Sequence, residues 1–252
     1  MPISYEFNES TFAAWVGTEI FNHIAADPDD ELIALPVVPT LTNEADWGYD
    51  LSIKSRWALI FLQFKLPVWV YGSNGGQRWR WGGPYFRFDV KTQTTSNGQE
   101  QHNTLVDLAN DRRPGAGFVY YCAPVFRTEA EFLGHVQAST VTENSVFPSP
   151  LALGRVAPNA VHCYTYVDPS EVVPFSEPLP ESPASVSTML DTVGEGVRAG
   201  ETMPLGQFLT SAGSVLGEIT GVDLNDSAPP LMAVATISSV LSLQPILLRT
   251  KG

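Results

Sequence analysis

The chain has few cysteines, few basic residues and no long apolar run. Its 252 residues include only Cys122 and Cys163, too few for a disulfide scaffold or a thiolate zinc site. No apolar stretch is long enough to cross a bilayer, and the N-terminal residues lack the basic and then apolar layout of a signal peptide. The sequence therefore predicts a soluble cytoplasmic protein with two buried thiols.

Basic residues are outnumbered by acids, 14 Lys and Arg against 27 Asp and Glu, which gives a formal net charge of −13. This balance alone argues against a general nucleic-acid binder. The distribution is uneven, however, because residues 51–99 carry seven cations and one acid, Asp89, a local net charge of 7 − 1 = +6. The segment either offers a basic face to an anionic partner or neutralises acids elsewhere on the fold. Its cations are Lys54, Arg56, Lys65, Arg78, Arg80, Arg87 and Lys91.

Two polar residues, Gln63 and Lys65, interrupt the apolar run between Trp57 and Val70. A buried lysine costs free energy unless it is paired or used. Two acids, Glu44 and Asp50, precede this pair. Local conflicts between polarity and burial tend to mark functional sites, so this set is the strongest chemical candidate in the chain.

Strand geometry connects these residues to metal chemistry. We expect strands over residues 49–53 and 57–64, joined by a turn at residues 54–56. Gln63 and Lys65 would then share one face, with Phe64 directed into the core. In such a hairpin Asp50 and Gln63 come within reach of one ion, which Glu44 approaches from upstream. Oxygen ligands of this kind suit Mg²⁺ or Mn²⁺, and a lysine stabilises charge on an attacked phosphate.

This arrangement resembles the PD-(D/E)xK nuclease superfamily, the restriction-endonuclease-like fold, over about residues 10–121. Asp50 matches the first acid, Gln63-x-Lys65 the following pair, and Glu44 the upstream glutamate. The resemblance implies a metal held by Glu44, Asp50 and Gln63, with Lys65 positioning or activating the water. It also implies that Gln101, at the start of a later helix, lies near the active site.

The chain departs from the family pattern at two places. Gln63 replaces the usual acid, which removes one negative charge and should weaken metal binding. Gly48-Tyr49 precedes Asp50 where the family has proline. The implied activity is endonucleolytic cleavage of DNA, with RNA left open, and a role in prokaryotic or phage genome defence follows by analogy. The expected nucleic-acid contacts are Lys54, Arg56, Arg78, Arg80, Arg87 and Gln101.

The remaining patterns predict an α+β fold, with a central mixed sheet flanked by helices and a C-terminal helical extension. Helices are expected at 10–26, 101–110 and 128–137, the last with a capping box, and strands at 85–90, 117–123 and 161–167. We expect a nuclease-like domain over 1–168, a Pro-rich acidic connector over 169–184, and a helical region over 185–252. That last region, with a buried helix at 231–248, is a candidate contact for a second copy or a partner protein.

Simpler interpretations stand beside this one. In the simplest of them the candidate residues have no catalytic role: Asp50 caps a turn, Lys65 extends from a strand end to solvent, and Glu44 lies on the surface. For His102 the two interpretations are a catalytic base and a solvent-facing helix residue, of which the sequence favours the second. The aromatic residues between Trp79 and Phe88 either stack on bases or form core. A catalytically silent interaction protein and a structural or assembly protein are the alternative functions.

Overall fold

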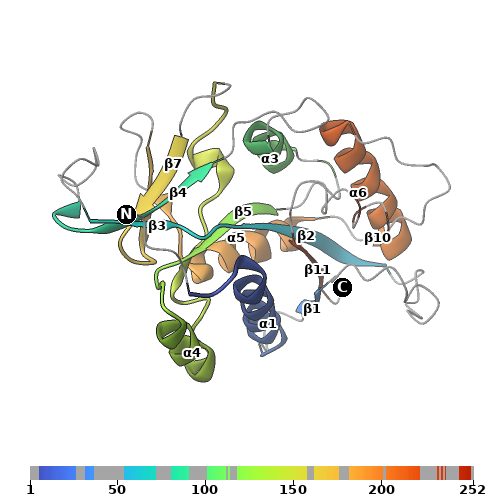
Figure 1. Cartoon of the computed structure of the whole chain (residues 1–252). Helices are drawn as coiled ribbons and strands as arrows, with labels where there is room; N and C mark the ends of the chain where they lie inside the picture. Colours follow the sequence, from blue (N-terminus) through green and yellow to red (C-terminus); the bar gives the residue numbers. More distant parts are fainter. Residues whose placement is uncertain are drawn as a thin grey trace.

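A mixed β-sheet runs through the centre of the computed structural model and carries helices on both faces (Figure 1). The predicted α+β class is therefore confirmed. The structure describes residues 6–26, 32–36, 54–71, 81–90, 101–111, 113, 118–157, 162–175, 182–200, 203–221, 232, 234, 236 and 244–250.

The longest strand of the central sheet is β2, Lys54–Phe64. It pairs in parallel with β5 (Phe118–Pro124) and antiparallel with β11 (Gln244–Thr250). Apolar side chains on both faces of β2 are buried, as expected of a central strand covered on two sides. The sheet is completed by β1 (Leu32–Pro36) beside β11, β6 (Ser145–Val146) beside β5, and β10 (Met203–Pro204) beside β2.

One core lies between the central sheet and two helices, α1 (Glu9–Ala26) and α5 (Val186–Ala199). Glu19 of α1 is 5% exposed. Its carboxylate accepts hydrogen bonds from the backbone N–H groups of Val141 and Thr142, at 3.0 and 2.8 Å, and from the Thr142 hydroxyl at 2.9 Å. These bonds join α1 to a turn more than one hundred residues later in the chain.

The opposite core contains α3 (Gln101–Asn110), α6 (Leu205–Thr220) and a second, antiparallel sheet. Figure 1 shows α3 and α6 on the side of the central sheet opposite to α1. The second sheet has the order β3, β4, β7, β8, β9, so β3 lies at its edge. Its strands are Val68–Val70, Tyr85–Val90, His162–Tyr166, Glu171–Phe175 and Ser182–Pro183.

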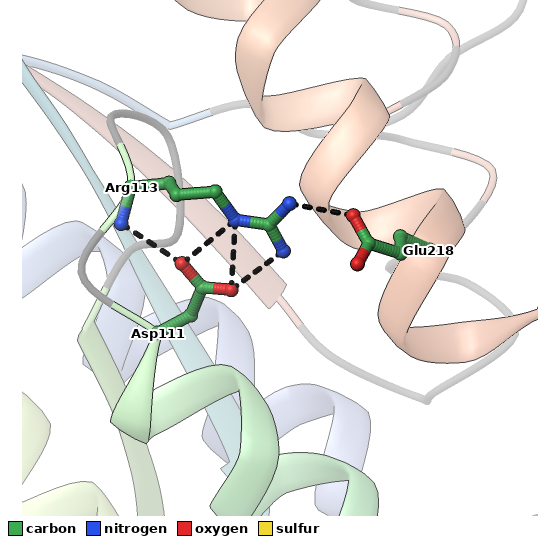
Figure 2. Close-up of polar contacts among 3 residues, drawn as sticks. All are labelled: Asp111, Arg113 and Glu218. Atoms are coloured by element: carbon green, nitrogen blue, oxygen red, sulfur yellow. Dashed lines mark hydrogen bonds and ion pairs between the residues drawn. The ribbon is translucent and has the colours of Figure 1, made fainter.

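An exposed ionic network joins the end of α3 to α6 (Figure 2). The Arg113 guanidinium donates to both carboxylate oxygens of Asp111, the shortest contact being 2.7 Å, and to Glu218 at 2.5 Å. Because the Arg113 and Glu218 side chains are exposed, their ion pair adds little to stability.

Several predicted elements are confirmed. α3 has the expected bounds, and strands β4, β5 and β7 lie where the apolar patterns placed them. The predicted capping box begins α4 (Glu129–Ala138), where Thr128 and Glu131 satisfy each other's backbone N–H groups. A short 3₁₀ turn, Pro150–Ala152, precedes β7. Tyr85, Phe86 and Phe88 are buried, so the core interpretation is confirmed for these three aromatic residues, whereas Trp81 is partly buried and Trp79 lies outside the described residues.

Two predictions for the second half of the chain are wrong. The residues expected to form an extended connector contain β8, which pairs with β7 in the second sheet. The helix expected through residue 248 is wrong at its end, because residues 244–250 form β11 between β1 and β2. Two helices that follow residue 184, α5 and α6, pack on opposite faces of the central sheet, α5 in the core that contains α1 and α6 in the core that contains α3. Among the described helices, none combines the length and apolarity needed to cross a membrane.

Candidate functional site

The polar pair Gln63 and Lys65 lies at the carboxyl end of β2, beside the parallel strand β5. Gln63 is in register with Tyr121, and Phe64 with Cys122. The backbone N–H of Lys65 donates to the Cys122 carbonyl at 2.9 Å, so the parallel ladder continues one residue beyond β2. In open α/β sheets, ligands bind outside the carboxyl ends of the strands. The pair therefore lies at the shared carboxyl end of β2 and β5, which are parallel, although β11 on the other side of β2 is antiparallel.

The two faces of β2 near this end differ in chemistry. Phe64 packs edge-on against Phe12 of α1, with ring centroids 5.7 Å apart, as predicted for a core residue. Gln63 lies on the other face and is only 2% exposed, whereas Lys65 is partly exposed. A buried amide brings a hydrogen-bonding group into an apolar layer, at a free-energy cost unless it is bonded there.

The expected hairpin between residues 49–53 and 57–64 is wrong, because its turn residues 54–56 belong to β2. Ser55 pairs with Met203 of β10, and Arg56 with Thr250 of β11. These partners come from distant parts of the chain and cannot be seen in the local sequence. Glu44 and Asp50, which the hairpin was expected to bring near Gln63, lie outside the described residues, as do Arg78 and Arg80.

Lys54 and Arg56 lie in the first three residues of β2, whereas Gln63 is the last residue but one. At a rise of about 3.3 Å per residue, their backbones lie roughly 23–30 Å from that of Gln63. The structure thus does not bring these two predicted nucleic-acid contacts to the carboxyl end of the strand.

The other two predicted contacts, Arg87 and Gln101, are described. Arg87 of β4 donates from Nε and Nη2 to one carboxylate oxygen of Asp89, at 2.9 and 2.7 Å. This pair offsets much of the positive charge that Arg87 would offer to a phosphate. Gln101 is partly buried at the first position of α3, over the face of the sheet that carries Gln63.

A histidine next to this region, His102, is buried, which the sequence did not lead us to expect. His102 is 1% exposed, so the prediction that it faces solvent is wrong. Its Nδ1 lies 2.8 Å from the Tyr121 hydroxyl and its Nε2 lies 2.8 Å from the Gly154 carbonyl oxygen. The spacing of three residues between His102 and the inner-face residue Leu105 was the signal that could have placed it inside.

The two partners of His102 fix its tautomer. A carbonyl oxygen only accepts, so Nε2 carries the proton and Nδ1 accepts from the Tyr121 hydroxyl. Burial lowers the pKa of His102, the bond to Gly154 opposes this shift, and His162 nearby adds to it. A neutral ring therefore holds the phenol of Tyr121, which is the register partner of Gln63.

Among the described residues, no three His, Cys, Asp or Glu side chains are grouped to hold a metal ion. The described part of the candidate site supplies the Gln63 amide, whose oxygen is a hard ligand, and the Lys65 ammonium. An amide oxygen can bind a divalent metal ion, and an ammonium group can bind a phosphate, so the two side chains together suit a phosphate that is bound to a metal.

Comparison with protein-family models, with curated proteins and with solved structures finds no match to this chain.

Proposed function

We propose that the chain is a Mg²⁺- or Mn²⁺-dependent nuclease of the PD-(D/E)xK type that hydrolyses phosphodiester bonds in DNA. One observation carries the proposal: Gln63 and Lys65 lie together at the carboxyl end of a buried strand, beside a parallel strand. The two residues are two positions apart, so they share one face of the strand, and they are the polar residues of an otherwise apolar run.

The proposed roles follow from the chemistry of each side chain. Glu44, Asp50 and Gln63 would supply oxygen ligands to the metal, which when bound lowers the pKa of a coordinated water and stabilises phosphate charge. Lys65 would stabilise negative charge on the attacked phosphate and orient the water. Of the three proposed ligands the structure describes Gln63, whose amide oxygen is of the hard type that Mg²⁺ takes.

The proposed setting is genome defence in the cytoplasm of a prokaryote or a phage-infected cell, by analogy with nucleases of this kind. DNA would be held by the basic segment 51–99, which carries seven of the 14 cations, with a smaller contribution from Arg87 because Asp89 is paired with it. We further propose that target choice depends on a second copy of the chain or on a partner protein, contacted through residues 185–252.

The test is cleavage of supercoiled plasmid, linear duplex and single-stranded DNA, and of RNA, with Mg²⁺, Mn²⁺ or EDTA. We expect metal-dependent cleavage that is lost in both Asp50→Ala and Lys65→Ala. The matched controls are Asp191→Ala and Arg155→Ala, which remove exposed charges from α5 and from an ion pair with Asp107. Full activity of the Lys65→Ala protein would overturn the assignment.

A second function, a catalytically silent interaction protein, is favoured by the neutral side chain of Gln63 where the family has an acid. It predicts no cleavage of any substrate and no heat of Mn²⁺ binding by isothermal titration. Mn²⁺ binding that is lost in Asp50→Ala would decide for a metal site and against the silent protein.

A further inference from the structure

Three side chains form a cluster beyond the carboxyl ends of β2 and β5. The guanidinium carbon of Arg127 lies 5.6 Å from the ring centroid of Trp69 and 5.7 Å from that of Tyr71. Arg127 also donates from Nη1 to the Tyr71 hydroxyl at 2.7 Å, and the two rings meet edge to face at 5.8 Å. We call these three residues the aromatic–arginine cluster.

The topology places this cluster beside the candidate site. Trp69 and Tyr71 follow Lys65 by four and six residues, and Arg127 follows Cys122 by five. Lys65 and Cys122 are themselves hydrogen-bonded through their backbones. Both segments therefore leave the parallel strand pair at the same end of the sheet, the end that carries Lys65.

The cluster is partly fixed and partly open. Trp69 packs on the buried ring of Phe86, with centroids 4.4 Å apart, so the base of the cluster is held by the core. Tyr71 is 53% exposed, and the strand that precedes it, β3, is the edge of its sheet. A rigid aromatic ring that stands half in solvent can receive a flat ligand with little loss of conformational entropy.

The charge of Arg127 is available to a ligand. Glu131, an acid that interacts electrostatically with Arg127, accepts with one carboxylate oxygen from the backbone N–H groups of Arg127 and Thr128, at 3.0 and 2.9 Å, and from the Thr128 hydroxyl. That carboxylate serves the capping box of α4. Within the ranges that the structure describes, the Arg127 guanidinium forms no ion pair, and its hydrogen bond goes to a neutral phenol.

An exposed ring beside a planar cation fits a nucleobase and its phosphate. Any of the bases can stack on an aromatic side chain, and an arginine can contact both the plane of the base and the phosphates of the nucleic-acid backbone. Inside a duplex each base is already stacked on both faces, so Tyr71 suits an unpaired base better than a paired one. We propose that the aromatic–arginine cluster binds single-stranded nucleic acid, with a base on Tyr71 and a phosphate at Arg127. The inference rests on the proposed function, since it names the strand held beside Lys65.

The test measures binding without metal, so that it does not depend on cleavage. Fluorescein-labelled 12-nucleotide oligothymidine, oligouridine and a 12-base-pair duplex are titrated with the full chain in EDTA, and anisotropy gives Kd. We expect Tyr71→Ala to raise Kd for the single strands by about fivefold or more, and Tyr71→Phe to change it by less than about twofold. Arg127→Ala should also lower the slope of log Kd against log salt by about 0.7.

Arg155→Ala is the matched control, because it removes an exposed arginine whose partner is Asp107. It should leave Kd within about twofold of the wild type. Tighter binding of oligothymidine would indicate a preference for DNA, and tighter binding of oligouridine a preference for RNA. Either preference agrees with the proposal. Equal Kd values for the wild type and Tyr71→Ala, no single-strand binding, or tighter binding of the duplex would overturn it.

The two proposals can fail separately. If no variant and no wild-type protein cuts nucleic acid, but Tyr71→Ala still weakens single-strand binding, the cluster stands and the nuclease does not. If cleavage requires Lys65 while Kd is the same with and without the Tyr71 ring, the nuclease stands and the cluster does not.

Discussion

The Tyr121 hydroxyl donates a hydrogen bond of 2.8 Å to Nδ1 of His102, which links the second residue of α3 to the strand that runs beside Gln63. The bond requires an unprotonated Nδ1, so it depends on the charge of a buried imidazole. Protonation of His102 would place a second donor opposite Tyr121, which would then have to turn its own proton away.

Stability should therefore fall as the pH drops below about 6.5, the pKa of an unperturbed histidine. The folded chain keeps His102 neutral to lower pH, because burial lowers its pKa, while the unfolded chain takes up the proton. The unfolded state then binds more protons, and the free energy of unfolding decreases. Tyr121 and His162 are the titratable groups set against His102.

Urea unfolding at pH 7.5 and 5.5 measures this effect. The loss of free energy between the two pH values should be smaller in His102→Gln than in the wild type, because the variant cannot titrate at this position. The same loss in both proteins would show that His102 does not carry the pH dependence.

Glu19 should be one of the most costly acids to remove. Glu19→Ala leaves the buried N–H groups of Val141 and Thr142 without their acceptor, and we expect a loss of about 2–4 kcal/mol in the free energy of unfolding. Glu143→Ala removes an exposed acid next to the same turn and should change stability by less than about 0.5 kcal/mol. Equal effects of the two variants in chemical denaturation would contradict the role of Glu19.

Two glycines of α5 should respond in opposite ways to alanine. A Cβ on Gly196 would come within 2.3 Å of the Phe118 ring, whereas a Cβ on Gly194 meets only the flexible end of Arg198 at 3.4 Å. Gly196→Ala should lower stability by about 1–3 kcal/mol. Gly194→Ala should leave it unchanged or raise it by up to about 1 kcal/mol, since alanine favours the helix. Thermal melting of the two variants tests this, and a stabilised Gly196→Ala protein would refute the close contact of α5 with β5.

Gln63→Glu tests whether position 63 faces the proposed metal. Without metal, a carboxylate at this buried position should lower the melting temperature, because a buried charge needs a partner. Saturating Mn²⁺ should restore most of that loss and raise the melting temperature of Gln63→Glu more than that of the wild type. A variant that Mn²⁺ stabilises no more than the wild type would place Gln63 outside a metal site.

Local patterns predicted the elements whose signals are local. α3 and α4 follow from helical spacing and from the Thr128–Glu131 capping box, which involve residues a few positions apart. β11 was missed because residues 244–248 are apolar enough for a buried helix or a strand, and the choice is made by β1 and β2 far along the chain. Glu19 was missed for the same reason, since its partners lie at 141–142.

For the candidate site, Gln63 and Lys65 were predicted because they interrupt an apolar run, and the strand predicted over residues 57–64 placed them near a strand end. The residues that neighbour Gln63 in space were not predicted. Tyr121 is beside it through the pairing of β2 with β5, and His102 is fixed by a bond to Gly154, fifty-two residues away. These contacts depend on the order of the strands in the sheet, and the spacing of residues within one segment does not determine that order.

The position of β11 also sets the order in which the molecule can be built. β2 needs β11 on one side, but roughly 180 residues separate the end of β2 from the end of β11. At a synthesis rate of about 5–20 residues per second, the open side of β2 waits roughly 10–40 s on the ribosome. During that time β2, whose residues Trp57 to Leu62 are all apolar, is an unpaired edge, so β2 is a segment that a chaperone would have to shield in a newly made chain.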